Sequence, residues 1–241
     1  MKLALLCTTK MFFPAGKNLH VLLVSLLLQL LSGITVNAQP APDEAYNKVI
    51  TERSIKIVNT LGIKDSVVYN KVMAVLVNQY RALNTIQETN SKQVAGIKQD
   101  TAAGKEIIAS RLKEQEEKRY NQTLQLHQQF IVGLQALISA EQLEQVKDGL
   151  TYSVFPKTYN AYLDMIPSLT AEQKLKIYDW LKEARELAMD GENSDKKHAV
   201  FGKYKGKINN YLSAQGYNVK KEGEEWAKRI EAQKKAKEVQ N

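Results

Sequence analysis

Hydrophobic residues recur at steps of three and four along almost the whole chain, and this periodicity is the feature that most constrains the fold. Between Asp43 and about Leu212, the apolar side chains return at intervals that place them on one face of an α-helix. No window alternates cleanly between apolar and polar residues, as a half-buried β-strand would. The sequence therefore predicts an all-α fold, built as a helical bundle.

Two of the expected helices are long and are separated only by a short polar segment. The first opens at Asp65, and the second follows residues 100–104. Two helices joined in this way fold back on each other as an antiparallel hairpin. The segment 113–119 (KEQEEKR) interrupts the apolar stripe of the second helix. We therefore expect the distal half of the hairpin to protrude from the core into water.

Capping residues and a proline divide the region after the hairpin. Ser139 with Gln142, and Thr170 with Gln173, have the spacing of a capping box, in which each side chain bonds the backbone N–H of the other residue. Each pair predicts a helix start. Pro156 lies inside the helical stripe between these two starts, and we expect it to kink or split that helix.

The N-terminus has the layout of a secretory signal peptide. Its apolar run, residues 21–31, would cover about 16 Å as a helix, roughly half of the ~30 Å hydrocarbon core of a bilayer. Lysines precede the run, and Val36 and Ala38 offer small residues at positions −3 and −1 of a cleavage site. We expect cleavage after Ala38, export to the periplasm or the cell exterior, and no membrane span in the mature chain. Met11 is an alternative to Met1 as the start.

These boundaries give a signal peptide at 1–38, a single all-helical domain at 39–219 and a charged tail at 220–241. The roughly 200 residues that follow the signal are enough for one domain with its own core. The tail consists mostly of Lys, Glu and Gln, with Trp226 and Ile230 as its large apolar residues. Such a composition predicts a marginally ordered helix.

Composition excludes several classes of function. The single cysteine, Cys7, lies within the signal, so the mature chain has no thiol for nucleophilic catalysis, metal binding or disulfides. The chain carries 34 Lys and Arg against 26 Asp and Glu, an excess too mild to indicate a nucleic-acid partner. Motifs for catalytic triads, zinc, phosphate loops or cofactors are absent from the sequence. We expect no cofactor or metal, and we lean towards a protein that is not an enzyme.

A run from Lys196 to Lys221 holds seven lysines and no acid, and a core helix is expected over about 197–214. Ammonium groups attract carboxylates, tyrosine rings stack on sugar rings, and asparagine amides bind hydroxyls, so this combination favours a site for an anionic glycan. The candidate ligand-binding residues are His198, Lys203, Tyr204, Lys205, Lys207, Asn209, Asn210 and Tyr211. One helix cannot turn all of them the same way, so some must be structural. The alternative is a helix whose lysines are simply solvated, while Ile208 and Tyr211 face the core.

Two other patterns favour structural interpretations. Asp179, Glu183, Glu186 and Asp190 form an acidic stripe, which is better explained as a solvated helix face than as a glycosidase pair or a calcium site. His127 lies next to an apolar stripe, and we expect a histidine at the core boundary that forms a hydrogen bond.

Aromatic residues at steps of three and four also mark one helical face. They are Tyr152, Phe155, Tyr159 and Tyr162. We favour a core stripe whose hydroxyls reach the rim, and a platform for stacking a ligand is the alternative.

The segments 152–163 and 180–190, and above all FGKYKGKINNYLSAQGY at 201–217, resemble the domain-of-unknown-function 3826 family over essentially the whole mature chain. That resemblance implies an exported bacterial protein that contacts sugars, encoded near genes for plant-polysaccharide breakdown. It supplies no binding or catalytic residues to transfer. The Leu-Thr-x-x-Gln phrase at 169–173 is also similar to small periplasmic chaperones of the spheroplast-protein type.

From these observations we predict an exported accessory protein that binds carbohydrate, including acidic plant-type polysaccharide. Two alternatives stay open. The first is a periplasmic helical chaperone or scaffold, and the second is a polysaccharide-processing enzyme without a recognisable motif.

Overall fold

The structure is a computed structural model that describes residues 44–239, so the expected signal peptide and residues 240–241 lie outside the described part. Within that part the chain forms eight α-helices and no β-strand, which confirms the predicted all-α bundle. The helices are α2 (Glu44–Asn59), α3 (Ser66–Gln99), α4 (Lys105–Gln135), α5 (Ala140–Leu150), α6 (Val154–Met165), α7 (Ala171–Met189), α8 (Ser194–Ala214) and α9 (Val219–Val239). None of them is both long enough and apolar enough to cross a bilayer.

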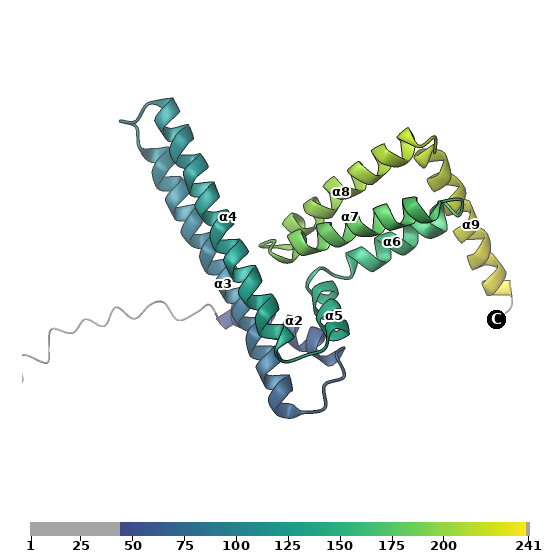
Figure 1. Ribbon diagram of the computed structural model, residues 1–241, viewed down its shortest axis with the longest axis horizontal. Helices are drawn as coiled ribbons and strands as arrows, with labels where there is room; N and C mark the ends of the chain where they lie inside the picture. The colour runs from purple at the N-terminus through teal and green to yellow at the C-terminus, as the bar shows by residue number, and fades with distance from the viewer. Residues whose placement is uncertain (1–43, 240–241) are drawn as a thin grey trace, which may run out of the picture. The chain divides into compact units, whose positions relative to one another are not determined.

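Helices α3 and α4 lie side by side as the predicted antiparallel hairpin (Figure 1). Asp65 caps α3, because its Oδ1 accepts from the backbone N–H groups of Val67 (2.7 Å) and Val68 (3.1 Å). The buried apolar residues of the hairpin gather at its base and are Val72, Leu76, Phe130 and Leu134. Farther out, the buried residue is Gln115, which donates to Asn90 Oδ1 at 2.9 Å. The distal half therefore contributes no residue to the described hydrophobic core clusters.

The core has two clusters of buried side chains. The first joins the base of the hairpin to α2 and α5 and includes Ile57, Val58, Leu143 and Val146. Helix α5 approaches α2 closely at Gly149, where a Cβ atom would lie 2.8 Å from Ile57 Cγ1. The second cluster fills the space between α6, α7 and α8, which lie side by side in Figure 1.

Both predicted capping boxes are present. Ser139 Oγ accepts from the N–H of Gln142 at 3.2 Å, and Thr170 Oγ1 accepts from the N–H of Gln173 at 3.2 Å. In each pair the glutamine Oε1 accepts in return from the N–H of the cap residue. Gln142 also donates its Nε2 to the carbonyl of Leu61 at 2.8 Å, which ties the start of α5 to the end of α2.

The helix expected to break at Pro156 is split, but at a different place. Tyr152 (φ 58°) and Ser153 (φ 55°) adopt left-handed backbone conformations between α5 and α6. Pro156 is the third residue of α6, within the first turn, where the backbone N–H groups have no acceptor inside the helix. A proline is tolerated in the first turn, and the break lies upstream of it, at Tyr152 and Ser153.

Two helices complete the C-terminal part. Helix α8 begins at Ser194, three residues before the predicted start, because the side chain of Asn193 accepts from the Lys196 N–H at 2.9 Å and caps it. The first half of α9 is anchored to the end of α6. Trp226 Nε1 donates to Asp164 Oδ2 (2.5 Å), and Arg229 donates to the backbone carbonyl of Asp164 (2.9 Å).

Candidate functional site

The predicted ligand-binding residues all lie on α8, but the structure divides them among different faces of that helix. Tyr204, Lys207 and Tyr211 lie beside α7, whereas Lys205 and Asn209 line a cavity against α6. The exposed His198 stacks on Tyr152, Lys203 lines a cleft that faces the hairpin, and Asn210 is exposed. The eight residues therefore do not form one site, as expected for positions spread around a helix.

Three rings and two lysines gather between α7 and α8, and we call this set the α7–α8 platform. Its members are Lys176, Trp180, Tyr204, Lys207 and Tyr211. The rings of Trp180 and Tyr211 meet edge to face, with centroids 5.3 Å apart and planes at 90°. Lys207 Nζ lies 4.6 Å from the Trp180 ring and 5.4 Å from the Tyr204 ring. Lys176 Nζ lies 5.5 Å from the Trp180 ring and 4.9 Å from the Tyr211 ring.

Helical spacing explains why these five residues meet. Lys176 and Trp180 are four residues apart on α7, so they share one face. Residues 204, 207 and 211 are spaced by three and four on α8 and also share a face. The neighbouring faces of both helices are buried in the second core cluster, through Ile177 and Leu181 on α7 and Ile208 and Leu212 on α8. The platform rings therefore lie at the edge of a rigid core, partly exposed.

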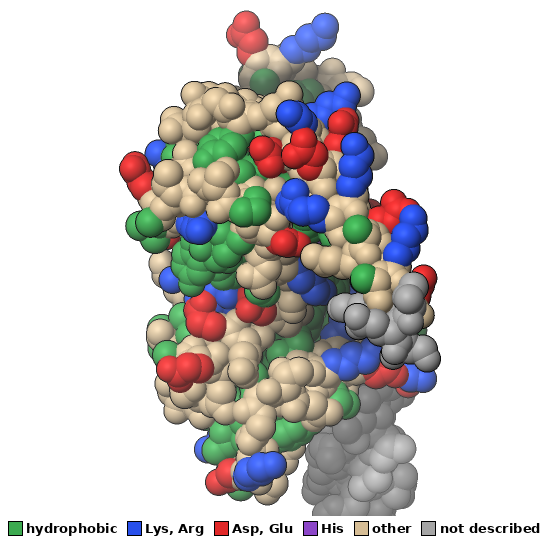
Figure 2. All heavy atoms as spheres, turned by 90° about the vertical axis from the view of Figure 1, so that its right-hand side faces the viewer, with side chains coloured by type: hydrophobic (Ala, Val, Ile, Leu, Met, Phe, Trp, Pro, Cys, Tyr) green, Lys and Arg blue, Asp and Glu red, His purple; other side chains and the backbone are tan. Residues whose placement is uncertain are grey.

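The electrostatics of the platform favour an anionic ligand. Lys176 and Lys207 are exposed and form no ion pair with any residue in the described range. Burial and a hydrogen bond to Glu183 raise the pKa of Tyr204 to about 12, so this phenol remains neutral at physiological pH. The protein surface is not uniformly basic, because Lys and Arg alternate with Asp and Glu over the face in Figure 2.

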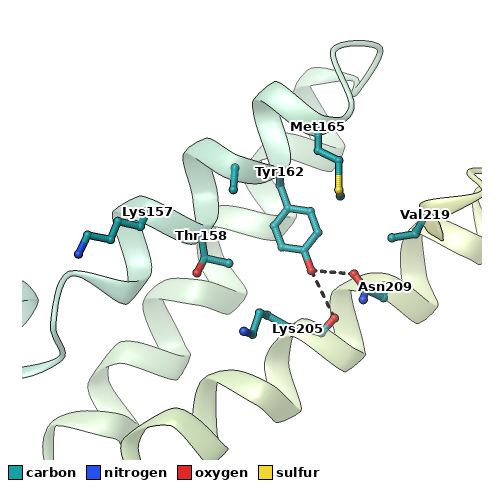
Figure 3. A pocket seen from close by; sticks show the side chains of 8 residues that line it. Lys157, Thr158, Tyr162, Met165, Lys205, Asn209 and Val219 are labelled. Atoms are coloured by element: carbon teal, nitrogen blue, oxygen red, sulfur yellow. Dashed lines mark hydrogen bonds between the residues drawn. The ribbon is translucent and has the colours of Figure 1, made fainter. Parts of the chain in front are cut away.

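A separate cavity of about 350 Å³, the α6–α8 pocket, lies on another side of α8 (Figure 3). Its lining residues are Lys157, Thr158, Ala161, Tyr162, Met165, Lys205, Asn209 and Val219. The Tyr162 hydroxyl donates to Asn209 Oδ1 at 2.7 Å and lies 3.5 Å from the Lys205 carbonyl. Burial raises the pKa of Tyr162 to about 12. The hydroxyl therefore remains protonated and holds the Asn209 amide in one orientation.

A cluster of charged residues joins α4, α5 and α7, and it corrects the interpretation of the acidic stripe. Asp190 binds His127 Nδ1 at 2.9 Å, and Glu186 accepts from Lys147 Nζ at 3.0 Å. The hydrogen bond expected for His127 is thus present. Asp179 and Glu183 are exposed, but Glu183 also accepts a hydrogen bond from Tyr204, so solvation explains only part of the stripe. Periodicity within α7 gives no sign that His127 of α4 and Lys147 of α5 lie beside Asp190 and Glu186.

The most buried member of this cluster is Arg185, with 1% of its surface exposed. It donates to Asp148 Oδ1 at 2.6 Å and binds Glu144, and its guanidinium lies 4.9 Å from the Phe155 ring. The cluster's carboxylates are therefore matched by cations from neighbouring helices. Such pairing supports a structural joint, although Asp190 Oδ1 and Arg185 Nε are buried there without a hydrogen-bond partner among the described residues.

Lys197 belongs to the lysine run but is buried. Its Nζ donates to the carbonyls of Leu150 and Met189, each at 3.0 Å, at the C-terminal ends of α5 and α7. The negative ends of these two helix dipoles suit an ammonium group. Burial lowers the pKa of Lys197 to about 8. This lysine therefore connects helices and is not available to a ligand.

Sequence reasoning missed Lys176 and Trp180 as members of the platform, and it missed Lys157 and Thr158 as lining of the pocket. It named Tyr162 for a ligand contact only in the alternative of a stacking platform. The four-residue spacing of Lys176 and Trp180 could have marked them as one exposed face, but no pattern within α7 shows that α8 lies alongside. Tyr162 was expected as a core residue with its hydroxyl at the rim, which is where the structure places it.

Residues 47–232 match the family described as "Protein of unknown function (DUF3826)". The matched range covers most of the sequence, and the chain belongs to this family. No curated protein matches the sequence.

Proposed function

We propose that this protein is an exported, non-catalytic carbohydrate-binding protein and that the α7–α8 platform binds an acidic glycan. One observation carries the proposal: two lysines that form no ion pair within residues 44–239 lie over three partly exposed aromatic rings at the edge of the second core cluster. Aromatic faces supply apolar contact for the C–H faces of sugar rings, and ammonium groups supply charge-assisted hydrogen bonds to carboxylates.

The positions of the lysines predict a preference for acidic over neutral sugars. In the free protein Lys207 covers part of the Trp180 ring, and an exposed cation–π contact of this kind contributes about 0.5–1 kcal/mol. A ligand that stacks on Trp180 must displace the ammonium group. An acidic sugar recovers that loss, because its carboxylate accepts a hydrogen bond from the displaced lysine. A neutral sugar offers the ammonium group only hydroxyls.

Affinity electrophoresis and calorimetry with polygalacturonate, and with dextran as a neutral polymer, test this proposal. We expect polygalacturonate to bind and dextran to bind far more weakly. The interaction with polygalacturonate should weaken as salt rises from about 0.05 to 0.5 M, because salt screens exposed charges. Equal binding of both polymers, or no binding of either, would contradict the proposal.

Three variants sharpen the test. Trp180→Ala should abolish binding because it removes the central ring, and the double change of Lys176 and Lys207 to Gln should remove both the acidic preference and the salt dependence. Lys182→Gln is the matched control, since Lys182 is an exposed lysine on α7 outside the platform. If Lys182→Gln weakened binding as much as the double change, general charge would explain the interaction better than the platform does.

A further inference from the structure

We propose that the α6–α8 pocket is a second binding site, distinct from the platform, and that its ligand is a small carboxylic acid with an apolar aryl or branched-alkyl body. This inference does not depend on the proposed glycan site. Lys205 and Lys207 are two residues apart, and successive residues of a helix are rotated by about 100°, so they point in nearly opposite directions. The pocket and the platform therefore use different sides of α8.

The size of the pocket selects a small molecule. At about 350 Å³ it lies near the lower end of the range of small-molecule sites, roughly 300–1,000 Å³. It is an open hollow against α6 and α8, whereas the platform is formed by side chains along α7 and α8. Figure 3 shows Tyr162 and Met165 on α6 facing α8, with Val219 at the start of α9. A polymer chain suits the platform better, and a compact ligand suits this cavity.

The apolar lining of the pocket favours a ligand that is apolar apart from its head group. Ala161, Met165 and Val219 contribute aliphatic and thioether surface, and Tyr162 contributes its ring. Tyr162 is 6% exposed and packs in the second core cluster, so its position is fixed by the core. A free sugar, with hydroxyls around its ring, would leave several of them against these apolar walls without partners, at a cost in free energy.

The polar groups select a carboxylate as the head group. Because Asn209 Oδ1 accepts from the Tyr162 hydroxyl, the Asn209 Nδ2 group is left as the donor, and it has no partner in the described residues. Lys205 Nζ has no ion pair in residues 44–239, and Lys157 Nζ donates only to the Tyr152 carbonyl at 3.2 Å. The described lining residues of the pocket include no Asp or Glu. Amide and ammonium donors without a competing acid favour an anion.

The test is a titration of the full-length protein with 3-phenylpropionate, followed by calorimetry and by ¹H–¹⁵N NMR. We expect saturable binding, with shifted amide signals from α6 and α8 around the pocket. Two matched probes separate the contributions of the carboxylate and of the apolar group. 3-Phenylpropionamide keeps the phenylethyl group but has no charge, and acetate keeps the charge but has no phenylethyl group. Both should bind at least about tenfold more weakly, the loss expected for one charge-assisted hydrogen bond or one buried ring.

Two variants locate the site. Lys205→Gln changes an exposed side chain and should weaken binding about tenfold without affecting folding. Asn209→Asp keeps an acceptor for the Tyr162 hydroxyl but places a carboxylate where the donor stood, so it should abolish binding. Lys207→Gln, on the platform, should have no effect on 3-phenylpropionate.

Each outcome decides the inference. Equal affinity for the acid and the amide, or unchanged affinity in Lys205→Gln, would overturn it. Failure of the glycan proposal would appear separately, as absence of polygalacturonate binding while 3-phenylpropionate still binds. Conversely, polygalacturonate binding that is lost in Trp180→Ala but kept in Asn209→Asp would show that the two sites are independent.

Discussion

The hairpin of α3 and α4 and the bundle of α6, α7 and α8 are built from the same helical periodicity but are stabilised differently. The distal half of the hairpin buries an amide pair, Gln115 with Asn90, whereas the bundle buries a contiguous apolar cluster with aromatic residues at its edge. Both candidate binding surfaces border the bundle. Hydrophobic periodicity therefore predicts where helices form. An apolar buried face, as in α6, α7 and α8, additionally indicates which helices can hold binding side chains in fixed positions.

The largest effect should come from the core of the bundle. Leu181→Ala removes a fully buried side chain (0% exposed) and should lower the free energy of unfolding by about 4 kcal/mol, through lost burial and a residual cavity. Ile107→Ala on the hairpin, where the side chain is 52% exposed, is the matched change. Urea denaturation followed by circular dichroism measures both. Similar losses of unfolding free energy in the two variants would contradict the proposed difference in how the hairpin and the bundle are stabilised.

A second large effect is expected at the joint between the hairpin and the bundle. Asp148→Asn would leave the buried Arg185 without one of its charged partners and should cost about 3 kcal/mol. Asp179→Asn, at an exposed position of α7, is the control and should change stability by less than about 0.5 kcal/mol. Equal unfolding midpoints for the two variants would show that the buried ion pairs contribute nothing.

The pH dependence of stability should reveal the contact between α4 and α7. The hydrogen bond to Asp190 raises the pKa of His127 above its ordinary value of 6.5, so the folded state binds the proton more tightly than the unfolded state does. The resulting stabilisation is complete below about pH 6.5 and is lost as the pH rises through the folded-state pKa. We expect a loss of about 1 kcal/mol, the scale of one hydrogen bond.

Denaturation at a series of pH values, with His127→Gln as the comparison, measures this effect. The variant should show no such decline in stability near neutral pH. A decline of the same size in the variant would assign it to other groups.

Lys197 should act in the opposite direction at higher pH. Its pKa is lowered to about 8, below the ordinary value of 10.5, so between these values the unfolded state binds more protons than the folded state. Stability should therefore rise from about pH 8 towards pH 10.5. The rise should be absent in Lys197→Met, and persistence of the rise in that variant would contradict the assignment.

The smallest effect should be at the surface of the hairpin. The Lys113–Glu117 pair, at 3.9 Å and largely exposed, should contribute less than about 0.5 kcal/mol. Glu117→Gln should leave the urea midpoint almost unchanged, and a loss above about 1 kcal/mol would show that the distal hairpin is more tightly organised than its burial indicates.

Local signals predicted the helices well. The Asp65 cap, the capping boxes of Ser139 and Thr170, and the turn at 100–104 each depend on residues close in sequence, and each is present. The split expected at Pro156 is present but lies just upstream, at Tyr152 and Ser153, and Pro156 itself occupies the first turn of α6.

The candidate site was predictable only in part. Lysines, tyrosines and asparagines on α8 were identified, but their division between the platform and the pocket depends on which neighbouring helix each one meets. Trp180 reaches Lys207 across α7 and α8, and Tyr162 reaches Asn209 across α6 and α8. Such contacts between helices leave no periodic signal in the sequence of either helix.

The turn between α5 and α6 connects the helices of the two core clusters through an unfavourable backbone conformation. Two successive residues other than glycine, Tyr152 and Ser153, adopt a conformation that costs roughly 1–3 kcal/mol each in isolation. The Tyr152 ring stacks on His198 of α8, and the Tyr152 carbonyl accepts from Lys157. The stacking on His198 comes from outside this segment and supports the bend against local preference, so a peptide of the segment alone would not retain it.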